Sequence, residues 1–217
     1  MNEFPIIQSS KTGVIDYGAG NLRSVCNALE LLGAPHKVIR APEDADDIEA
    51  LIFPGVGAFG DSMKNIRAQN LEGFLCDWVT SDKPLLAICI GYQVLFESSE
   101  ESPEEPGLGI FKGKVRRFPS QPGLKVPHMG WNSLQLADSA DPAWKDFPEY
   151  PYVYFVHSFF PEPEDVDLVA ARCDYGVNFA AAIRRGNLTA TQFHPEKSQS
   201  LGLKLIENFL VQQKTVI

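Results

Sequence analysis

A short apolar run that ends at a cysteine and a glycine constrains the fold more than any other stretch of this chain. Leu85–Ile88 follows Pro84 and is unbroken and partly β-branched, which is typical of a strand buried on both faces. Gly91 interrupts the run, and Tyr92–Phe96 then follow a spacing that is compatible with a helix. The pattern therefore predicts a strand-to-helix turn that contains Cys89.

A cysteine in such a turn has a chemical use. Its side chain projects into the open, the backbone N–H of Ile90 points to where an oxyanion can form, and the helix N-terminus favours the reactive thiolate. The tight turn needs small residues two positions to either side, and Ala87 and Gly91 meet this need. A buried core thiol is the alternative interpretation, and this segment alone does not decide between the two.

A nucleophilic cysteine needs a base and a group that orients the base. Among the four histidines, His194 differs because Pro195 and Glu196 follow it, and the proline favours an extended conformation that brings residues i and i+2 to one side. Glu196 would hold one imidazole nitrogen and leave the other to take the cysteine proton. An exposed loop is the better interpretation of an isolated His-Pro-Glu, but the turn at Cys89 favours a triad. His157, inside an aromatic run, is interpreted as a core histidine.

Two motifs about a hundred residues apart resemble those of the class I (triad) glutamine amidotransferases. They are Ala-Ile-Cys-Ile-Gly-Tyr-Gln around Cys89 and Gln-Phe-His-Pro-Glu-Lys around His194. Four further segments look like the glutaminase subunits of imidazole glycerol phosphate synthases, from histidine biosynthesis: Asp16–Leu22, Pro54–Phe59, Pro127–Asn132 and Tyr154–Ser158. The resemblance covers about residues 13 to 213 in chain order. The family usually has glycine where this chain has Ala87.

The resemblance implies a role for each of several residues. The triad would be Cys89, His194 and Glu196, and the loop Pro54–Gly57, which is otherwise an ordinary glycine turn, would complete an oxyanion hole. The residues implied are Gly55, Val56 and Ile90 for the oxyanion hole; Gln93, Ser158 and Phe159 for substrate binding; and Asn21, Trp131 and Lys197 for a partner interface. No metal and no cofactor are expected.

The implied function is hydrolysis of glutamine to glutamate and ammonia through a cysteine thioester. The ammonia would pass to a cyclase subunit of (β/α)8-barrel type in a heterodimer, which makes imidazole glycerol phosphate and an aminoimidazole carboxamide ribotide. Three alternatives differ in partner or chemistry: an amidotransferase that makes anthranilate, guanylate or pyridoxal phosphate, a γ-glutamyl peptidase that acts alone, and a non-catalytic binding module. The segment Pro127–Asn132 argues against the first, and the complete triad argues against the third.

Composition limits the classes of partner. The net charge of −9 and the sequence pI of about 4.9 would repel a phosphate backbone, so we expect no nucleic-acid partner. We find no signal peptide and no apolar stretch of the ~20 residues that a membrane span needs, so we expect a cytoplasmic protein that does not bind a membrane. The cysteines are too far apart to predict a zinc site or a disulfide framework, and Cys26 and Cys76 are interpreted as core residues.

We expect one α/β domain over residues 13–217, preceded by a tail over residues 1–12. Strands at 13–16, 37–40, 51–53 and 85–88 alternate with helices at 21–32, 59–68 and 71–80, which predicts a mostly parallel sheet flanked by helices. An acidic loop over 98–107 is interpreted as solvated. Short β-runs between residues 110 and 193 predict added antiparallel strands, and Ser198 is expected to cap a last helix. Ligands bind beyond the C-terminal ends of such parallel strands, where Cys89 falls.

Overall fold

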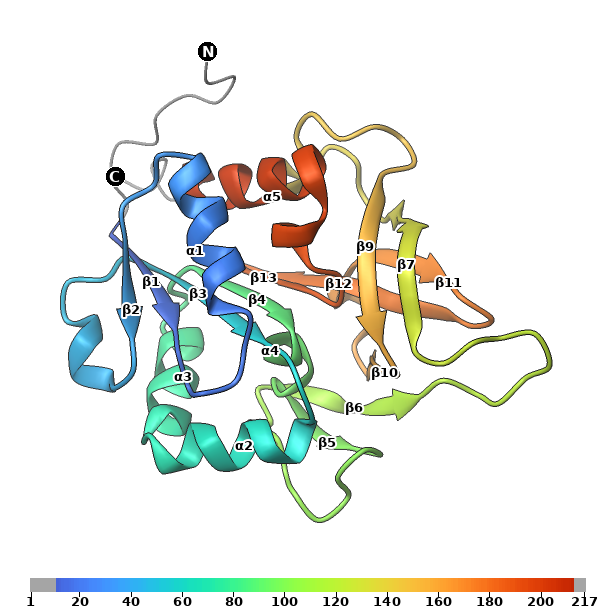
Figure 1. The fold of residues 1–217 in the computed structure, drawn as a ribbon, viewed down its shortest axis with the longest axis horizontal. Helices are drawn as coiled ribbons and strands as arrows, with labels where there is room; N and C mark the ends of the chain where they lie inside the picture. Colours follow the sequence, from blue (N-terminus) through green and yellow to red (C-terminus); the bar gives the residue numbers. More distant parts are fainter. Residues whose placement is uncertain (1–10, 213–217) are drawn as a thin grey trace.

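Parallel strands form the centre of the structure, a computed structural model that describes residues 11–212 (Figure 1). The largest sheet has eight strands in the order β2-β1-β3-β4-β13-β12-β11-β8. Its parallel strands are β1 Thr12–Ile15, β2 His36–Ile39, β3 Ala50–Gly55, β4 Leu85–Cys89 and β13 Leu188–Thr191. The apolar sequence of β3 and β4 fits their position, because every residue of both strands is buried.

Helices cover both faces of this sheet (Figure 1). On one face lie α1 Leu22–Leu31 and α5 Gln199–Gln212, and on the other lie α2 Phe59–Ala68 and α3 Leu71–Thr80. Short 3₁₀ helices complete the connections: η1 Pro42–Ala45, η2 Pro142–Trp144, η3 Val166–Leu168 and η4 Pro195–Lys197. This layering buries the apolar stripe of each long helix against the sheet.

The second half of the chain adds antiparallel strands and two smaller sheets. The large sheet is extended by β12 Asn178–Arg185, β11 Val169–Asp174 and β8 Gln135–Leu136. A three-stranded sheet holds β10 Phe159–Pro163, β6 Phe111–Arg117 and β5 Phe96–Ser99. A two-stranded antiparallel sheet pairs β7 His128–Ser133 with β9 Tyr152–His157.

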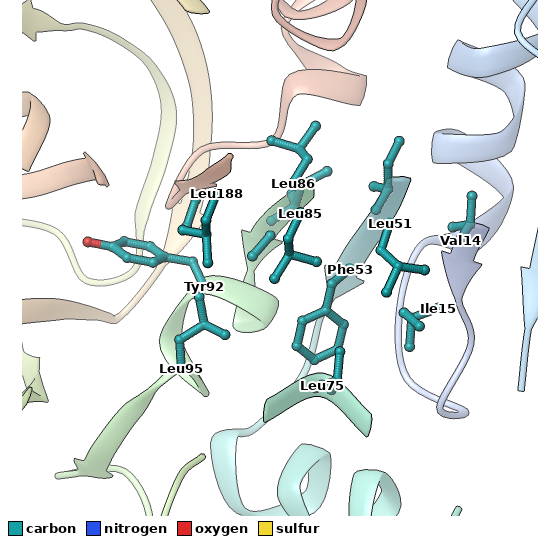
Figure 2. Packing of buried hydrophobic residues seen from close by; sticks show 14 of the residues in the cluster. Val14, Ile15, Leu51, Phe53, Leu75, Leu85, Leu86, Tyr92, Leu95 and Leu188 are labelled. Atoms are coloured by element: carbon teal, nitrogen blue, oxygen red, sulfur yellow. The ribbon is translucent and has the colours of Figure 1, made fainter. Parts of the chain in front are cut away.

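The core begins at the parallel strands and continues into the turn after Cys89. Figure 2 shows Leu51 and Phe53 of β3 and Leu85 of β4 in this cluster, together with Tyr92 and Leu95 from the segment after the turn. All five side chains are fully buried. The segment after the cysteine is therefore fixed by the same apolar packing that fixes the sheet.

Most of the predicted elements are confirmed, but the helix expected over Tyr92–Phe96 is wrong in extent. The helix α4 spans only Ile90–Gln93, and Phe96 already begins β5, where it pairs with Phe111 of β6. Strand pairing thus ends the helix after one turn, and the first residues of the predicted acidic loop lie in a strand.

Other corrections have similarly specific causes. The expectation of added antiparallel strands is incomplete, because β13 pairs antiparallel with β12 but parallel with β4. The strand β10 was not predicted; its prolines, Pro161 and Pro163, disfavour a central strand, and β10 lies at the edge of its sheet. The Ser198 hydroxyl, expected to cap α5, instead accepts a hydrogen bond from the Tyr154 N–H.

The domain boundaries remain a prediction at both ends. Strand β1 begins at Thr12, one residue inside the predicted tail. Residues 1–10 of the tail lie outside the described residues, as do residues 213–217.

We predict that Gly91→Ala destabilises the fold by about 1–3 kcal/mol, because a Cβ atom at this position would lie 2.1 Å from the backbone oxygen of Phe53. Gly73→Ala is the matched control. Gly73 lies exposed in α3 with no atom within 4 Å of its Cβ position, so the same change should stabilise by about 0.5–1 kcal/mol. Urea unfolding measures both, and a Gly91→Ala chain as stable as the wild type would contradict the prediction.

Candidate active site

The strand-to-helix turn exists and holds Cys89 in an unusual backbone conformation. Cys89 has φ +57° and ψ −106°, a region that residues other than glycine rarely occupy. The methyl group of Ala87 is fully buried within β4, between its sheet neighbours Phe53 and Ala190. The alanine in place of the family's usual glycine is therefore accommodated, and the turn still closes.

A buried histidine–glutamate pair lies beside this cysteine. His194 Nδ1 is 2.8 Å from Glu196 Oε1, and the two side chains are 1% and 2% exposed. The His194 N–H donates to the carbonyl of Tyr154 and the Ser198 hydroxyl donates to the carbonyl of His194, which fixes the backbone. Because the carboxylate accepts at Nδ1, Nε2 remains for Cys89 in the same pocket.

Opposing influences set the pKa of His194. Burial is the largest and lowers it, whereas the electrostatic interaction with the neighbouring Cys89 and the hydrogen-bonded Glu196 carboxylate raise it. The net result raises the pKa of His194 to about 10. The imidazole therefore keeps its proton at neutral pH, as a general acid beside a nucleophilic cysteine must.

A cavity of about 290 Å³ opens above these residues. Of the residues predicted for the site, it is lined by Cys89, His194, Val56, Ile90, Gln93, Ser158 and Phe159. Two predicted residues lie behind this lining: Glu196 supports His194, and Gly55 pairs with Cys89 in the β3–β4 register. The structure thus brings together every residue predicted for catalysis, the oxyanion hole and substrate binding.

Gly55 is held in place by close neighbours. A Cβ atom at Gly55 would lie 2.4 Å from the Tyr17 hydroxyl and 2.8 Å from the backbone nitrogen of Gly91. Gly57, two residues on, has φ +102° and open space at its Cβ position. The loop between them is therefore packed on one side and open toward the pocket.

Several pocket residues were missed by sequence reasoning. Glu101, Pro127 and His157 line the cavity, although the segment around Glu101 was interpreted as a solvated loop. The Glu101 carboxylate accepts from the N–H of Phe59, which directs it inward at the start of α2. Gln192 was also missed; its side chain donates to the Cys89 sulfur at 3.7 Å. In the sequence, only the position of Gln192 two residues before His194 indicated that it could lie near the site.

The predicted interface residues lie on neighbouring elements. Asn21 precedes α1 and Lys197 ends η4, and η4 contacts both α1 and β9. Trp131 on β7 is 45% exposed, and its ring packs edge-on against Tyr154 of β9. Lys197 therefore lies in the segment that follows His194, and Asn21 and Trp131 lie next to α1 and β9, the two elements that contact this segment.

The other cysteines differ from Cys89. Cys26 and Cys76 are only half-buried, so their interpretation as core residues is wrong. Burial raises the pKa of both thiols, and it raises that of the buried Cys173 to about 12. Within residues 11–212, no group of three or more metal-ligating side chains occurs, and no helix is long and apolar enough to cross a membrane.

The sequence matches the model of the family "Glutamine amidotransferase class-I" over residues 13–213. The chain belongs to the class I glutamine amidotransferases. It is an enzyme of this family, as the two motifs around Cys89 and His194 indicate.

Relatives within the family are similar over nearly the whole chain. The imidazole glycerol phosphate synthase subunit HisH of Gloeothece citriformis is 48% identical over 200 residues, covering 92% of this chain and 94% of the relative. The subunit of the same name from Thermosynechococcus vestitus is 50% identical over 198 residues, covering 91% and 94%. The resemblance to these subunits is thereby confirmed.

Solved structures support the fold. A crystal structure of a glutamine amidotransferase superimposes with a TM-score of 0.73 at 23% identity, covering 94% of this chain and 100% of the other. PurLQS from Thermotoga maritima gives 0.74 at 21% identity, covering 94% and 99%. The predicted α/β fold with a mostly parallel sheet is therefore confirmed.

We predict that Cys89→Ala lowers the pKa of His194 from about 10, because the electrostatic interaction with Cys89 is lost while burial still disfavours the imidazolium. NMR titration of the His194 ring measures this. Cys76→Ala is the control, since its thiol contacts the Leu108 carbonyl outside the pocket and its removal should leave the titration unchanged. A His194 pKa that does not fall in Cys89→Ala would exclude direct coupling of the two side chains.

Proposed function

We propose that this chain is the glutaminase subunit of an imidazole glycerol phosphate synthase. The observation that carries the proposal is the buried His194–Glu196 pair beside the strained Cys89, in a pocket of a chain about half identical to subunits of that name. The reaction is hydrolysis of glutamine to glutamate and ammonia. The ammonia then passes to a second subunit.

The pocket geometry supports a thioester mechanism. The Cys89 thiolate attacks the side-chain carboxamide carbon of glutamine, and N–H groups of Ile90 and of the Gly55–Val56 peptide stabilise the oxyanion. His194, oriented by Glu196, donates its Nε2 proton to the amide nitrogen as the carbon–nitrogen bond breaks and ammonia leaves. It then takes a proton from water, whose oxygen attacks the thioester and releases glutamate and the thiolate.

Substrate recognition follows from the charges of the pocket. Glutamine carries an α-ammonium group, and Glu101 supplies a carboxylate at the pocket wall that forms no ion pair with any described residue. Ser158 and Phe159 also line the pocket, and the Gln93 side chain donates to the Phe159 carbonyl. A free amino acid with both an ammonium and a carboxamide fits this arrangement.

The acceptor of the ammonia belongs on a partner. Free ammonia is protonated in neutral water and loses its nucleophilicity, so it must be passed on without equilibrating with solvent. We propose a cyclase of (β/α)8-barrel type in a heterodimer, which converts a phosphoribulosyl aminoimidazole-carboxamide precursor to imidazole glycerol phosphate and an aminoimidazole carboxamide ribotide. Exposed apolar side chains on β7 and β9 offer a docking face, namely Met129, Trp131 and Tyr152.

Docking of the partner would also prevent the hydrolysis of glutamine when no acceptor for the ammonia is present. The loop Pro54–Gly57 contains two glycines, so a flip of the Gly55–Val56 peptide exchanges a carbonyl for an N–H in the oxyanion hole. A partner that binds the active loop more tightly by about 3–4 kcal/mol changes activity ~10²–10³-fold. We propose Asn21, Trp131 and Lys197 as contacts that transmit this preference, since η4, which follows His194, contains Lys197 and contacts α1 and β9.

We predict that Cys89→Ala abolishes glutamine hydrolysis and retains the fold and the binding of the cyclase, because only the nucleophile is removed. Glutamate release in the complex measures the first effect, and gel filtration with the cyclase measures the second. Cys76→Ala, a half-buried thiol outside the pocket, should keep full activity. Near-native turnover in Cys89→Ala would remove Cys89 from the mechanism.

We predict that the cyclase with its nucleotide ligand raises glutaminase turnover ~10²–10³-fold over the chain alone. Trp131→Ala should weaken the complex and therefore the activation, whereas Val166→Ala, which removes an apolar side chain that is 65% exposed on η3, should not. Titration of glutamate release with the cyclase tests both. If the isolated chain is as active as the mixture, the proposed control of the Pro54–Gly57 loop by the partner is wrong. A γ-glutamyl peptidase that acts alone is then favoured.

A further inference from the structure

Two buried histidines pair across the small sheet next to the pocket. His128 of β7 and His157 of β9 are opposite each other in the strand register, and they are 3% and 6% exposed. His128 Nδ1 is 3.0 Å from His157 Nε2. Neither ring takes part in the proposed thioester mechanism, although His157 lines the cavity.

The neighbours of the pair determine where its protons lie. His157 Nδ1 is 2.8 Å from the carbonyl of Phe159, which can only accept, so Nδ1 donates and Nε2 is the acceptor. His128 must then donate from Nδ1, and its Nε2 accepts from the Asn132 side-chain amide at 3.4 Å. Both rings are thus neutral, and burial lowers the pKa of His128 to about 4 and that of His157 to about 3.

The same chain of hydrogen bonds continues into the active site. The Phe159 carbonyl also accepts from the Gln93 side chain at 3.0 Å, and that amide donates at 3.0 Å to Gln192. Gln192 in turn donates to the Cys89 sulfur at 3.7 Å. The buried Gln93 side-chain oxygen has no partner among the described residues and remains for a ligand of the pocket.

The opposite face of the small sheet is apolar and exposed. Side chains alternate along β7, so His128 faces the interior while its neighbour Met129 is 63% exposed. Trp131 is exposed on the same outer side and pairs with Tyr154 of β9 (the strands are marked in Figure 1). A partner that shifts this sheet therefore moves the histidine pair with it.

We propose that His128 and His157 are positioning residues for glutamine, an inference that rests on the proposed function. As a neutral hydrogen-bonded pair they hold the Phe159 carbonyl and the Gln93 amide in place, and so connect the exposed face of β7 and β9 to the substrate pocket. They touch neither the reacting atoms nor the His194–Glu196 pair in this role.

A purely structural role predicts something different. The His128 ring stacks on Tyr175 at 3.8 Å and on Phe155 at 4.7 Å between ring centroids, and these contacts need only an aromatic ring. His128→Phe keeps such a ring but leaves His157 Nε2 without its donor. His128→Asn loses the ring but restores an amide donor near the Nδ1 position. The two variants therefore separate hydrogen bonding from packing.

The test uses two reagents that alkylate Cys89 in the full chain bound to the cyclase, because the chain alone is proposed to hold the inactive loop. One is the chloroketone analogue of glutamine, whose chloride the thiolate displaces, and the other is iodoacetamide, which reports the accessibility and reactivity of the thiolate alone. We expect His128→Phe to lower the rate with the chloroketone about tenfold relative to that with iodoacetamide, because a buried acceptor loses its hydrogen bond. His128→Asn should recover most of this ratio. Tyr175→Phe, which keeps the ring stack, is the control and should match the wild type.

Each outcome decides the question. A lowered ratio in His128→Phe with recovery in His128→Asn supports the proposal. An unchanged ratio in His128→Phe, a lowered ratio that His128→Asn does not recover, or equal loss of both rates in both variants overturns it. If the wild-type complex itself shows no preference for the chloroketone, the proposed function fails and the positioning role falls with it, whereas a preference in His128→Phe as large as that of the wild type overturns the positioning role alone.

Discussion

The parallel pairing of β4 with β3 on one side and β13 on the other is the constraint on which the site depends. Parallel strands end at the same edge of a sheet, so three chain segments that are distant in sequence leave the sheet together. Val56 follows β3, Cys89 ends β4, and His194 follows β13. The proposed nucleophile, its proposed base and the candidate oxyanion loop therefore meet at one edge of the sheet, each within a few residues of a strand end.

Burial gives these groups their chemistry. In water an imidazole and a glutamate interact weakly, but the His194–Glu196 pair is almost fully enclosed, and its hydrogen bond is correspondingly strong. The same enclosure requires partners for the polar groups around it. The side chains of Gln93 and Gln192 bond to each other, as do the neutral rings of His128 and His157, and the Phe159 carbonyl joins the two pairs. The wall of the pocket is therefore a connected polar layer.

The spacing of apolar and turn residues correctly predicted the elements whose bounds depend on residues close together in the chain. The helices α2 and α3 have the predicted bounds, since their apolar spacing and flanking turn residues suffice to define them. Pairing with distant strands decided the rest. Phe96 has a helix-compatible spacing but pairs with Phe111, and β10 carries prolines that only an edge position tolerates. Ser198 looks like a helix cap, yet its hydroxyl bonds to β9, which no local pattern reveals.

The sequence by itself determined the chemistry of the site: a cysteine in a strand-to-helix turn and a histidine followed by proline and glutamate, each specified by neighbours within a few residues. Only the tertiary structure decided what surrounds them. Glu101 lines the pocket because its carboxylate bonds to the start of α2, and Gln192 reaches Cys89 because β13 lies beside β4. His157 is both the core histidine that its aromatic setting indicates and a lining residue of the pocket, since β9 borders the site. These contacts join residues far apart in the chain, and spacing along the sequence carries no information about them.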